Sequence, residues 1–182
     1  MLTTELVTAS ELLELPEDYR CELIRGVIVE VSPAFWDHDS LVGILIEHLV
    51  MYNVRTRVGM VRSGDGGYIL EHDPDTVLAP DIAVVRREQS GRPPRGTHSY
   101  IPFPPLLAVE VKSPSNSERR IAEKTDIYLA AGVGEVWWVL PTDDTVSRST
   151  ADGSTMVFRR GDTLTSTVLP GFTLALVDLF GD

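Results

Sequence analysis

Apolar residues with helical spacing mark one long segment in the first half of the chain. Four positions between residues 41 and 52 carry large apolar side chains three or four residues apart, which predicts a helix over residues 38–54. Asp37 or Asp39 is expected to cap its start. The apolar positions of this predicted helix are Leu41, Leu45, Leu49 and Tyr52.

Short apolar runs bounded by turn residues predict β-strands on both sides of this helix. Residues 21–24 and 27–31 predict a hairpin that turns at Arg25-Gly26, with Ser32-Pro33 stopping its second strand. Three further strands are predicted at residues 60–62, 68–70 and 82–85.

The second half of the chain predicts a strand, a helix and another strand that lie together. The strands are expected at 106–112 and 135–140, and the helix at 118–131, with Gly132 where helices commonly end. A helical crossover between two strands of one sheet makes them parallel. With a second hairpin turning at Asp152-Gly153, the order predicts an α/β fold, a mixed β-sheet flanked by helices with N-terminal and C-terminal β-hairpins.

Composition limits the class of protein. The 182 residues, 43% hydrophobic and 24% charged, fit one globular domain over residues 1–182. The single cysteine, Cys21, excludes an internal disulfide and a thiolate zinc cluster, and so favours a reducing cytoplasm. The first residues lack the pattern of a signal peptide, and no apolar run has the length of a membrane span. We therefore expect a cytoplasmic protein with no membrane partner.

Charged residues interrupt the apolar pattern at two strand ends. Asp81 begins the strand at 82–85, and Glu110 and Lys112 lie two residues apart in the strand at 106–112, on the face opposite Val109 and Val111. Carboxylates suit Mg²⁺ or Mn²⁺, and a lysine stabilises negative charge that develops on a phosphate. The alternative is a surface Glu–Lys pair beside an ordinary turn aspartate.

The net charge of −11 opposes binding to nucleic acid, because phosphates are held by lysine and arginine. Acidic residues that hold a metal would reduce this objection, and so would clustering of the basic residues. A solvated acidic surface with scattered arginines is the alternative. The basic clusters are Arg86, Arg87, Arg92 and Arg95; Arg119, Arg120 and Lys124; and Arg55, Arg57 and Arg62.

These motifs resemble a known group of enzymes. Pro80-Asp81, a variable spacer and Glu110-Val111-Lys112 are similar to the pattern of the PD-(D/E)XK nuclease superfamily. Nearly the whole chain, in order, resembles one branch of it, the Uma family of "putative restriction endonucleases". The resembling segments are 19–26, Ser32-Pro33 with His38, 79–85, 109–114, Lys124 with 128–133, 135–141, 161–165 and 169–172.

The resemblance implies a restriction-endonuclease-like core and a set of site residues. Mg²⁺ or Mn²⁺ would bind at Asp81 and Glu110, with Val111 as a further metal position, and Lys112 would stabilise the transition state. The family often lacks a lysine at the position of Lys112, and a helix lysine, here Lys124, is thought to replace it. This chain has both lysines, so the choice between them stays open.

Two more positions match residues that the family keeps. Glu22 would be a further carboxylate near the metal, or else the exposed alternate position of an amphipathic strand. His38 would position a water molecule or contact phosphate, or else only cap its helix. Tyr128, Trp137 and Trp138 are expected to pack in the core rather than stack on bases.

The resulting hypothesis is a Mg²⁺- or Mn²⁺-dependent endonuclease with DNA as the expected substrate. A homodimer is expected by analogy, because cleavage of a duplex needs two sites. One alternative is a catalytically silent module that binds a protein or nucleic-acid partner. Another is a hydrolase of a smaller phosphodiester, in which case the arginine-containing loop at 88–105, with Arg92 and Arg95, would not affect activity.

Overall fold

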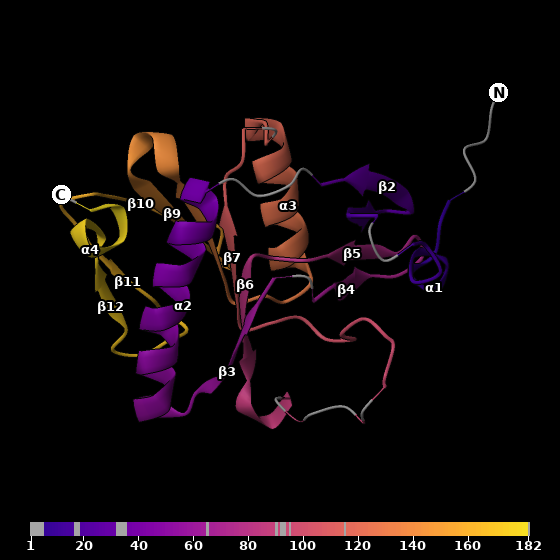
Figure 1. Cartoon of the computed structure of the whole chain (residues 1–182), viewed down its shortest axis with the longest axis horizontal. Helices are drawn as coiled ribbons and strands as arrows, with labels where there is room; N and C mark the ends of the chain where they lie inside the picture. Colours follow the sequence, from indigo (N-terminus) through magenta and orange to yellow (C-terminus); the bar gives the residue numbers. More distant parts are fainter. Residues whose placement is uncertain are drawn as a thin grey trace.

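A six-stranded mixed β-sheet lies at the centre of the computed structural model, in the order β10-β9-β8-β7-β6-β3 (Figure 1). Strands β7 (Leu107–Val111) and β8 (Glu135–Leu140) run parallel, and the other neighbouring pairs are antiparallel. The remaining strands of this sheet are β3 (Gly59–Ser63), β6 (Ile82–Arg86), β9 (Thr145–Thr150) and β10 (Thr155–Arg159). The structure describes residues 6–16, 19–31, 36–64, 66–89, 91, 94, 96–114 and 116–181.

Two helices cover opposite faces of this sheet, and β7 lies between them (Figure 1). Helix α2 (Trp36–Thr56) buries its four predicted apolar residues against Leu107, Val109 and Val111 of β7. Helix α3 (Glu118–Ala130) packs against Ala108 on the other face. Because side chains alternate along a strand, Glu110 therefore faces α3. The predictions that Val109 and Val111 point into the core and that β7 and β8 are parallel are confirmed.

A second sheet of four strands, in the order β2-β1-β5-β4, lies beside α3. The predicted hairpin of β1 (Cys21–Ile24) and β2 (Val27–Glu30) is confirmed, with Arg25 and Gly26 at positive φ in its turn. Strand β5 (Thr76–Leu78) joins β1 to β4 (Tyr68–Glu71) and was not predicted. The short helix α1 (Ala9–Leu12) packs against β1 and β5.

The C-terminal segment completes the core on the side of α2. Strands β11 (Thr163–Thr165) and β12 (Thr173–Ala175) pair with each other, and α4 (Leu176–Phe180) follows them. Their apolar residues join the core that α2 covers. Two short 3-10 turns, η1 (Arg87–Gln89) and η2 (Pro141–Asp143), follow β6 and β8.

The element boundaries correct two details of the expectations. Helix α2 begins at Trp36, so Asp37 and Asp39 lie in its first turn and the expectation that one of them caps the helix is wrong. Strand β7 ends at Val111, which leaves Lys112 just beyond it. Ser32-Pro33, Arg92 and Arg95 lie outside the described residues. Among the residues that are described, no helix is long and apolar enough to cross a membrane.

Candidate active site

A buried lysine and two buried carboxylates from three different elements meet between α3 and the two sheets. Lys124 Nζ lies 2.7 Å from Glu110 Oε1 and 3.0 Å from Glu22 Oε1. All three residues are buried. Glu22 also accepts a hydrogen bond from the backbone N–H of Ala79, at 3.1 Å. Burial of unpaired charges is costly, so each member of this cluster depends on the others.

Local sequence explains why these side chains point toward one another. Glu110 occupies the β7 face that packs on α3, next to the positions taken by the core valines. On α3, Lys124 and Tyr128 are four residues apart and therefore lie on one face of the helix, which is turned toward the sheets. Ser117 caps the start of α3, where its side chain accepts from the backbone N–H of Arg120, and thereby sets the helix register.

Tyr128 takes part in the cluster through its hydroxyl group. The hydroxyl donates a hydrogen bond to Glu110 Oε1 at 2.7 Å. Burial, followed by the charges of Glu110 and Glu22, raises the pKa of Tyr128 well above its ordinary value, so this group stays a donor. The expectation that Tyr128, Trp137 and Trp138 pack in the core is confirmed, since all three are buried. The contact of Tyr128 with Glu110 was not foreseen.

Asp81 is attached to the end of β7 and to α2. Its Oδ2 accepts a hydrogen bond from the backbone N–H of Val111 at 2.7 Å and lies 3.2 Å from Nε2 of His38. The hydrogen bond to Asp81 raises the pKa of His38, against the lowering effect of its burial. The structure thus brings Asp81 and His38 to the strand end that carries Glu110.

Opposing effects of burial and charge act on the central ion pair. Burial raises the pKa of Glu110, the positive charge of Lys124 opposes this, and the nearby carboxylates of Glu22 and Asp81 add to the rise, with a net pKa of about 7. Burial alone would lower the pKa of Lys124, but the charges of Glu110 and Glu22 outweigh it and raise that pKa. Lys124 is therefore a permanent positive charge rather than a base.

Lys112 has a different environment from Lys124. Its Nζ lies 2.5 Å from Glu118 Oε1 at the start of α3, and a quarter of its side chain is exposed. Lys112 and Glu110 both have partners on α3, as expected for two residues on one side of a strand. In the described part of the chain, however, it is Lys124 and not Lys112 that forms an ion pair with Glu110.

Comparisons with known proteins identify the family and the fold. The sequence model of the Uma2 family, described as "Putative restriction endonuclease", matches residues 9–177. The chain belongs to this family. The fold is also that of a crystal structure titled as a "putative nuclease belonging to DUF820" from Anabaena variabilis ATCC 29413, with a TM-score of 0.82 and 21% identity over 96% of this chain and 97% of that chain. No curated protein matches the Uma2 chain.

The expected fold class, a restriction-endonuclease-like α/β core, is thus confirmed for this Uma2 protein. Its donor set can be compared with the ligands that Mg²⁺ or Mn²⁺ require. One oxygen of each carboxylate, Oδ2 of Asp81 and Oε1 of Glu110, is engaged by protein donors. No hydrogen bond between described residues uses the other oxygen of either group.

Val111 completes this possible donor set only through its backbone. Its side chain is buried in the core, so only its carbonyl oxygen is a possible ligand. Two carboxylates and a carbonyl suit a hard cation that keeps several waters. Within the described residues, no three His, Cys, Asp or Glu side chains come together as a metal-binding group. The oxygen donors of Asp81, Glu110 and Val111 are of the kind that Mg²⁺ and Mn²⁺ prefer, whereas Zn²⁺ prefers nitrogen and sulfur ligands.

Proposed function

We propose that the chain is a Mg²⁺- or Mn²⁺-dependent endonuclease that hydrolyses phosphodiester bonds of DNA within one domain. The observation that carries the proposal is the contact of Lys124 with Glu110, beside Asp81 at the same strand end. Buried acids held near a fixed positive charge are arranged for chemistry on an anion rather than for packing. Membership in the Uma2 family supports the same reaction class.

Asp81, Glu110 and the carbonyl of Val111 would hold the metal. When bound, such an ion lowers the pKa of a water nucleophile and stabilises the leaving oxygen. His38 holds one oxygen of Asp81, and Tyr128 holds one oxygen of Glu110, so that each carboxylate keeps a fixed orientation. Glu22 also anchors Lys124, through the same Nζ atom that contacts Glu110.

Lys124 rather than Lys112 is the proposed stabiliser of the transition state. Its ammonium group is in contact with Glu110, and its raised pKa keeps it charged where negative charge develops on the phosphate. The ammonium of Lys112 is engaged by Glu118 instead. The role assigned to Lys112 from the motif therefore passes to Lys124 in this proposal.

A catalytically silent binding module is the second candidate. The observation that favours it is that Glu110 and Glu22 both pair with a cation of the protein itself, Lys124, in a chain of net charge −11. Such a module would keep the fold and bind a partner without cutting it. A homodimer is expected for the enzyme when it cuts duplex DNA.

Cleavage of supercoiled plasmid and of single-stranded DNA tests the proposal. The protein is incubated in Mg²⁺, Mn²⁺ or EDTA, together with Asp81→Asn, Lys124→Gln and Lys112→Ala. We expect metal-dependent nicking that Asp81→Asn and Lys124→Gln each reduce at least about 100-fold, the usual effect of removing one electrostatic stabiliser. Lys112→Ala should retain most of the activity, and circular dichroism checks that each variant is folded.

The pattern of results separates the candidates. Loss of activity in Lys112→Ala with retention in Lys124→Gln would return the catalytic role to the strand lysine. Cleavage that is indifferent to Asp81→Asn would contradict the site as a whole. Binding of DNA without cleavage in any metal would favour the silent module.

A further inference from the structure

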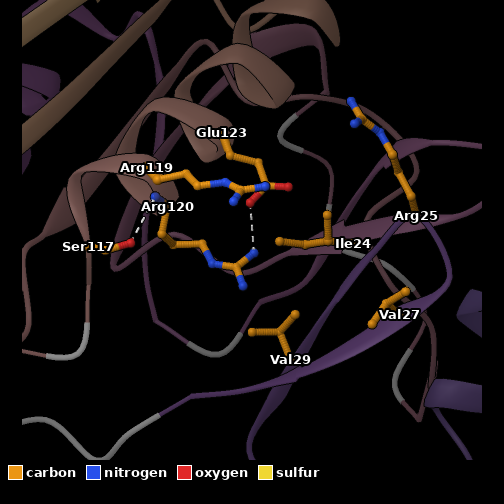
Figure 2. Close-up of a pocket in the computed structure, with 8 residues that line it drawn as sticks. All are labelled: Ile24, Arg25, Val27, Val29, Ser117, Arg119, Arg120 and Glu123. Atoms are coloured by element: carbon orange, nitrogen blue, oxygen red, sulfur yellow. Dashed lines mark hydrogen bonds and ion pairs between the residues drawn. The ribbon is translucent and has the colours of Figure 1, made fainter.

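A cavity of about 460 Å³ opens between the β1–β2 hairpin and the first turns of α3 (Figure 2). Its apolar wall consists of Ile24, Val27 and Val29 from the hairpin. Figure 2 shows the side chains of Arg119 and Arg120 extending from α3 toward this wall. The cavity thus combines an apolar side with guanidinium groups.

The cavity directly continues the candidate active site. On β1, Ile24 is two residues from Glu22 and faces the same way, about 7 Å farther along the strand. On α3, Arg120 is four residues from Lys124, one helical turn toward the start of the helix and about 6 Å away. Because Glu22 and Lys124 are in contact, the cavity lies one step along the same β1–α3 interface.

Positive charge predominates in the cavity although the chain is acidic overall. Three arginines line it, Arg25, Arg119 and Arg120, against the single carboxylate of Glu123. Arg120 is paired with Glu123 at 3.0 Å, and Arg25, which is largely exposed, lies 3.4 Å from Glu71. Arg119 is exposed, and within the described part of the chain no ion pair or hydrogen bond engages its guanidinium. An anion could therefore bind Arg119 without breaking an existing pair.

The first turn of α3 adds to this preference for anions. Ser117 caps the helix at the rim of the cavity, so the positive end of a 13-residue helix lies beside the arginines. The wall of exposed or half-buried valines suits the sugar and base parts of a nucleotide better than a second charged surface. Charge, apolar contact and continuity with the candidate active site together indicate one kind of occupant.

We propose that the strand being cut passes through this cavity, where Arg119 and Arg120 bind phosphates adjacent to the scissile one. Ile24, Val27 and Val29 contact the sugars between these phosphates. This inference rests on the proposed nuclease function and adds the path of the substrate. Arg25 lines the cavity on the hairpin side.

Binding in EDTA tests the path without cleavage. Fluorescence anisotropy is measured with labelled single-stranded DNA, duplex DNA and single-stranded RNA, over a series of salt concentrations. Arg119→Ala is the main variant, because Arg119 is exposed and its loss leaves no described carboxylate without its partner. We expect about tenfold weaker binding of at least one probe and a salt slope smaller by about one.

Two further variants sharpen the comparison. Arg55→Ala is the matched control, because Arg55 is an exposed arginine in the last turn of α2, about 26 Å along that helix from His38. Arg25→Asn tests the hairpin side, since Arg25 has a φ of 48° and asparagine tolerates this conformation. Arg25→Asn should weaken binding, whereas Arg55→Ala should not.

Each outcome bears on the path and on the nuclease separately. Nucleic acid that is cut by the wild type but bound equally well by Arg119→Ala would overturn the path and leave the nuclease intact. Equal losses in Arg55→Ala and Arg119→Ala would also overturn it, as a general charge effect. Binding that depends on Arg119 without any cleavage would support the path and contradict the nuclease. Labelled poly-glutamate is measured as a further anionic probe. A protein that binds poly-glutamate and none of the nucleic acids would overturn both the path and the nuclease.

Discussion

At the scale of single residues, the ammonium group of Lys124 stabilises two carboxylates that would otherwise repel each other in a buried position. Glu110 and Glu22 are both buried, and each contacts the same nitrogen atom. Removing one partner of a buried ion pair leaves an uncompensated charge, which costs more than the pair itself contributes. Stability and the candidate chemistry therefore depend on one side chain.

Lys124→Met should lower the free energy of unfolding by about 3 kcal/mol, because it leaves Glu22 and Glu110 without their cation. The matched change is Lys112→Met, which removes a partly exposed pair and should cost less than about 1 kcal/mol. Urea denaturation followed by circular dichroism measures both. Equal losses in the two variants would contradict the buried cluster.

Tyr128→Phe should reduce both stability and cleavage. The change removes the hydrogen bond to Glu110, worth roughly 2 kcal/mol for a bond to a charged acceptor, and frees the orientation of that carboxylate. Tyr52→Phe is the control, because the Tyr52 hydroxyl donates to the carbonyl of Pro170 at 3.0 Å, away from the carboxylates. The control should lose stability with kcat unchanged, so a kcat effect in both variants would argue against a specific role of Tyr128.

At the scale of elements, Glu135 attaches the start of β8 to the segment that connects β11 to β12. This fully buried carboxylate accepts hydrogen bonds from Trp137 Nε1, from Ser166 Oγ and from both the N–H and the hydroxyl of Thr167. Arg148 adds an ion pair at 3.5 Å. The carboxylate is therefore a structural charge, with its acceptor positions used by neighbouring segments.

Glu135→Ala should lower the free energy of unfolding by about 3 kcal/mol or more, because four donors lose their acceptor in the interior. Glu135→Gln keeps the shape and part of the hydrogen bonding, and should lose less. Thermal unfolding measures both variants, and cleavage below the melting temperature should stay near the wild-type rate. A selective loss of cleavage in folded Glu135→Ala would place this residue in the chemistry.

Sequence periodicity predicted the elements that carry a complete apolar face. The four apolar positions foreseen for α2 are the four that it buries, and the bounds of β8 agree with the strand predicted at 135–140, where five apolar residues follow Glu135. Strand β5 was missed because Thr76, Val77 and Leu78 are too few to show a period. Its existence depends on pairing with β1 and β4, which are distant in sequence.

The candidate site was predictable in its parts and not in its contacts. Spacing identified Asp81 and Glu110, because each interrupts an apolar strand at its end. The choice between two lysines depends on which of them reaches Glu110, and that is decided by the packing of α3 on β7. Lys112 pairs instead with Glu118, six residues away. This pairing depends on the side-chain rotamers, which the spacing in the sequence does not reveal.

At the scale of the whole molecule, a chain of net charge −11 contains a cavity that three arginines line. The net charge of −11 repels a polyanion at long range, whereas the three arginines of the cavity attract it at contact. Added salt screens the long-range repulsion and also weakens the contacts between arginines and phosphates. In the bound complex the contacts outweigh the repulsion, so they decide whether affinity rises or falls with salt.

Affinity for a single-stranded probe should therefore fall with salt, with a slope of log K against log salt of about −1.5 to −2 for the two or three phosphates that the arginines of the cavity can hold. Anisotropy titrations between 50 and 200 mM salt measure this slope. A slope near zero, or affinity that rises with salt, would mean that repulsion by the acidic surface dominates and that the arginines do not hold phosphate.

The arrangement of β7 and α3 has a consequence for recombination between related genes. The contiguous stretch 107–130 contains Glu110 and the two residues that contact its carboxylate, Lys124 and Tyr128. An exchange of that stretch therefore transfers all three residues together. A breakpoint between residues 112 and 117 would separate them. Viable chimaeras should accordingly carry their crossovers outside this strand–helix unit.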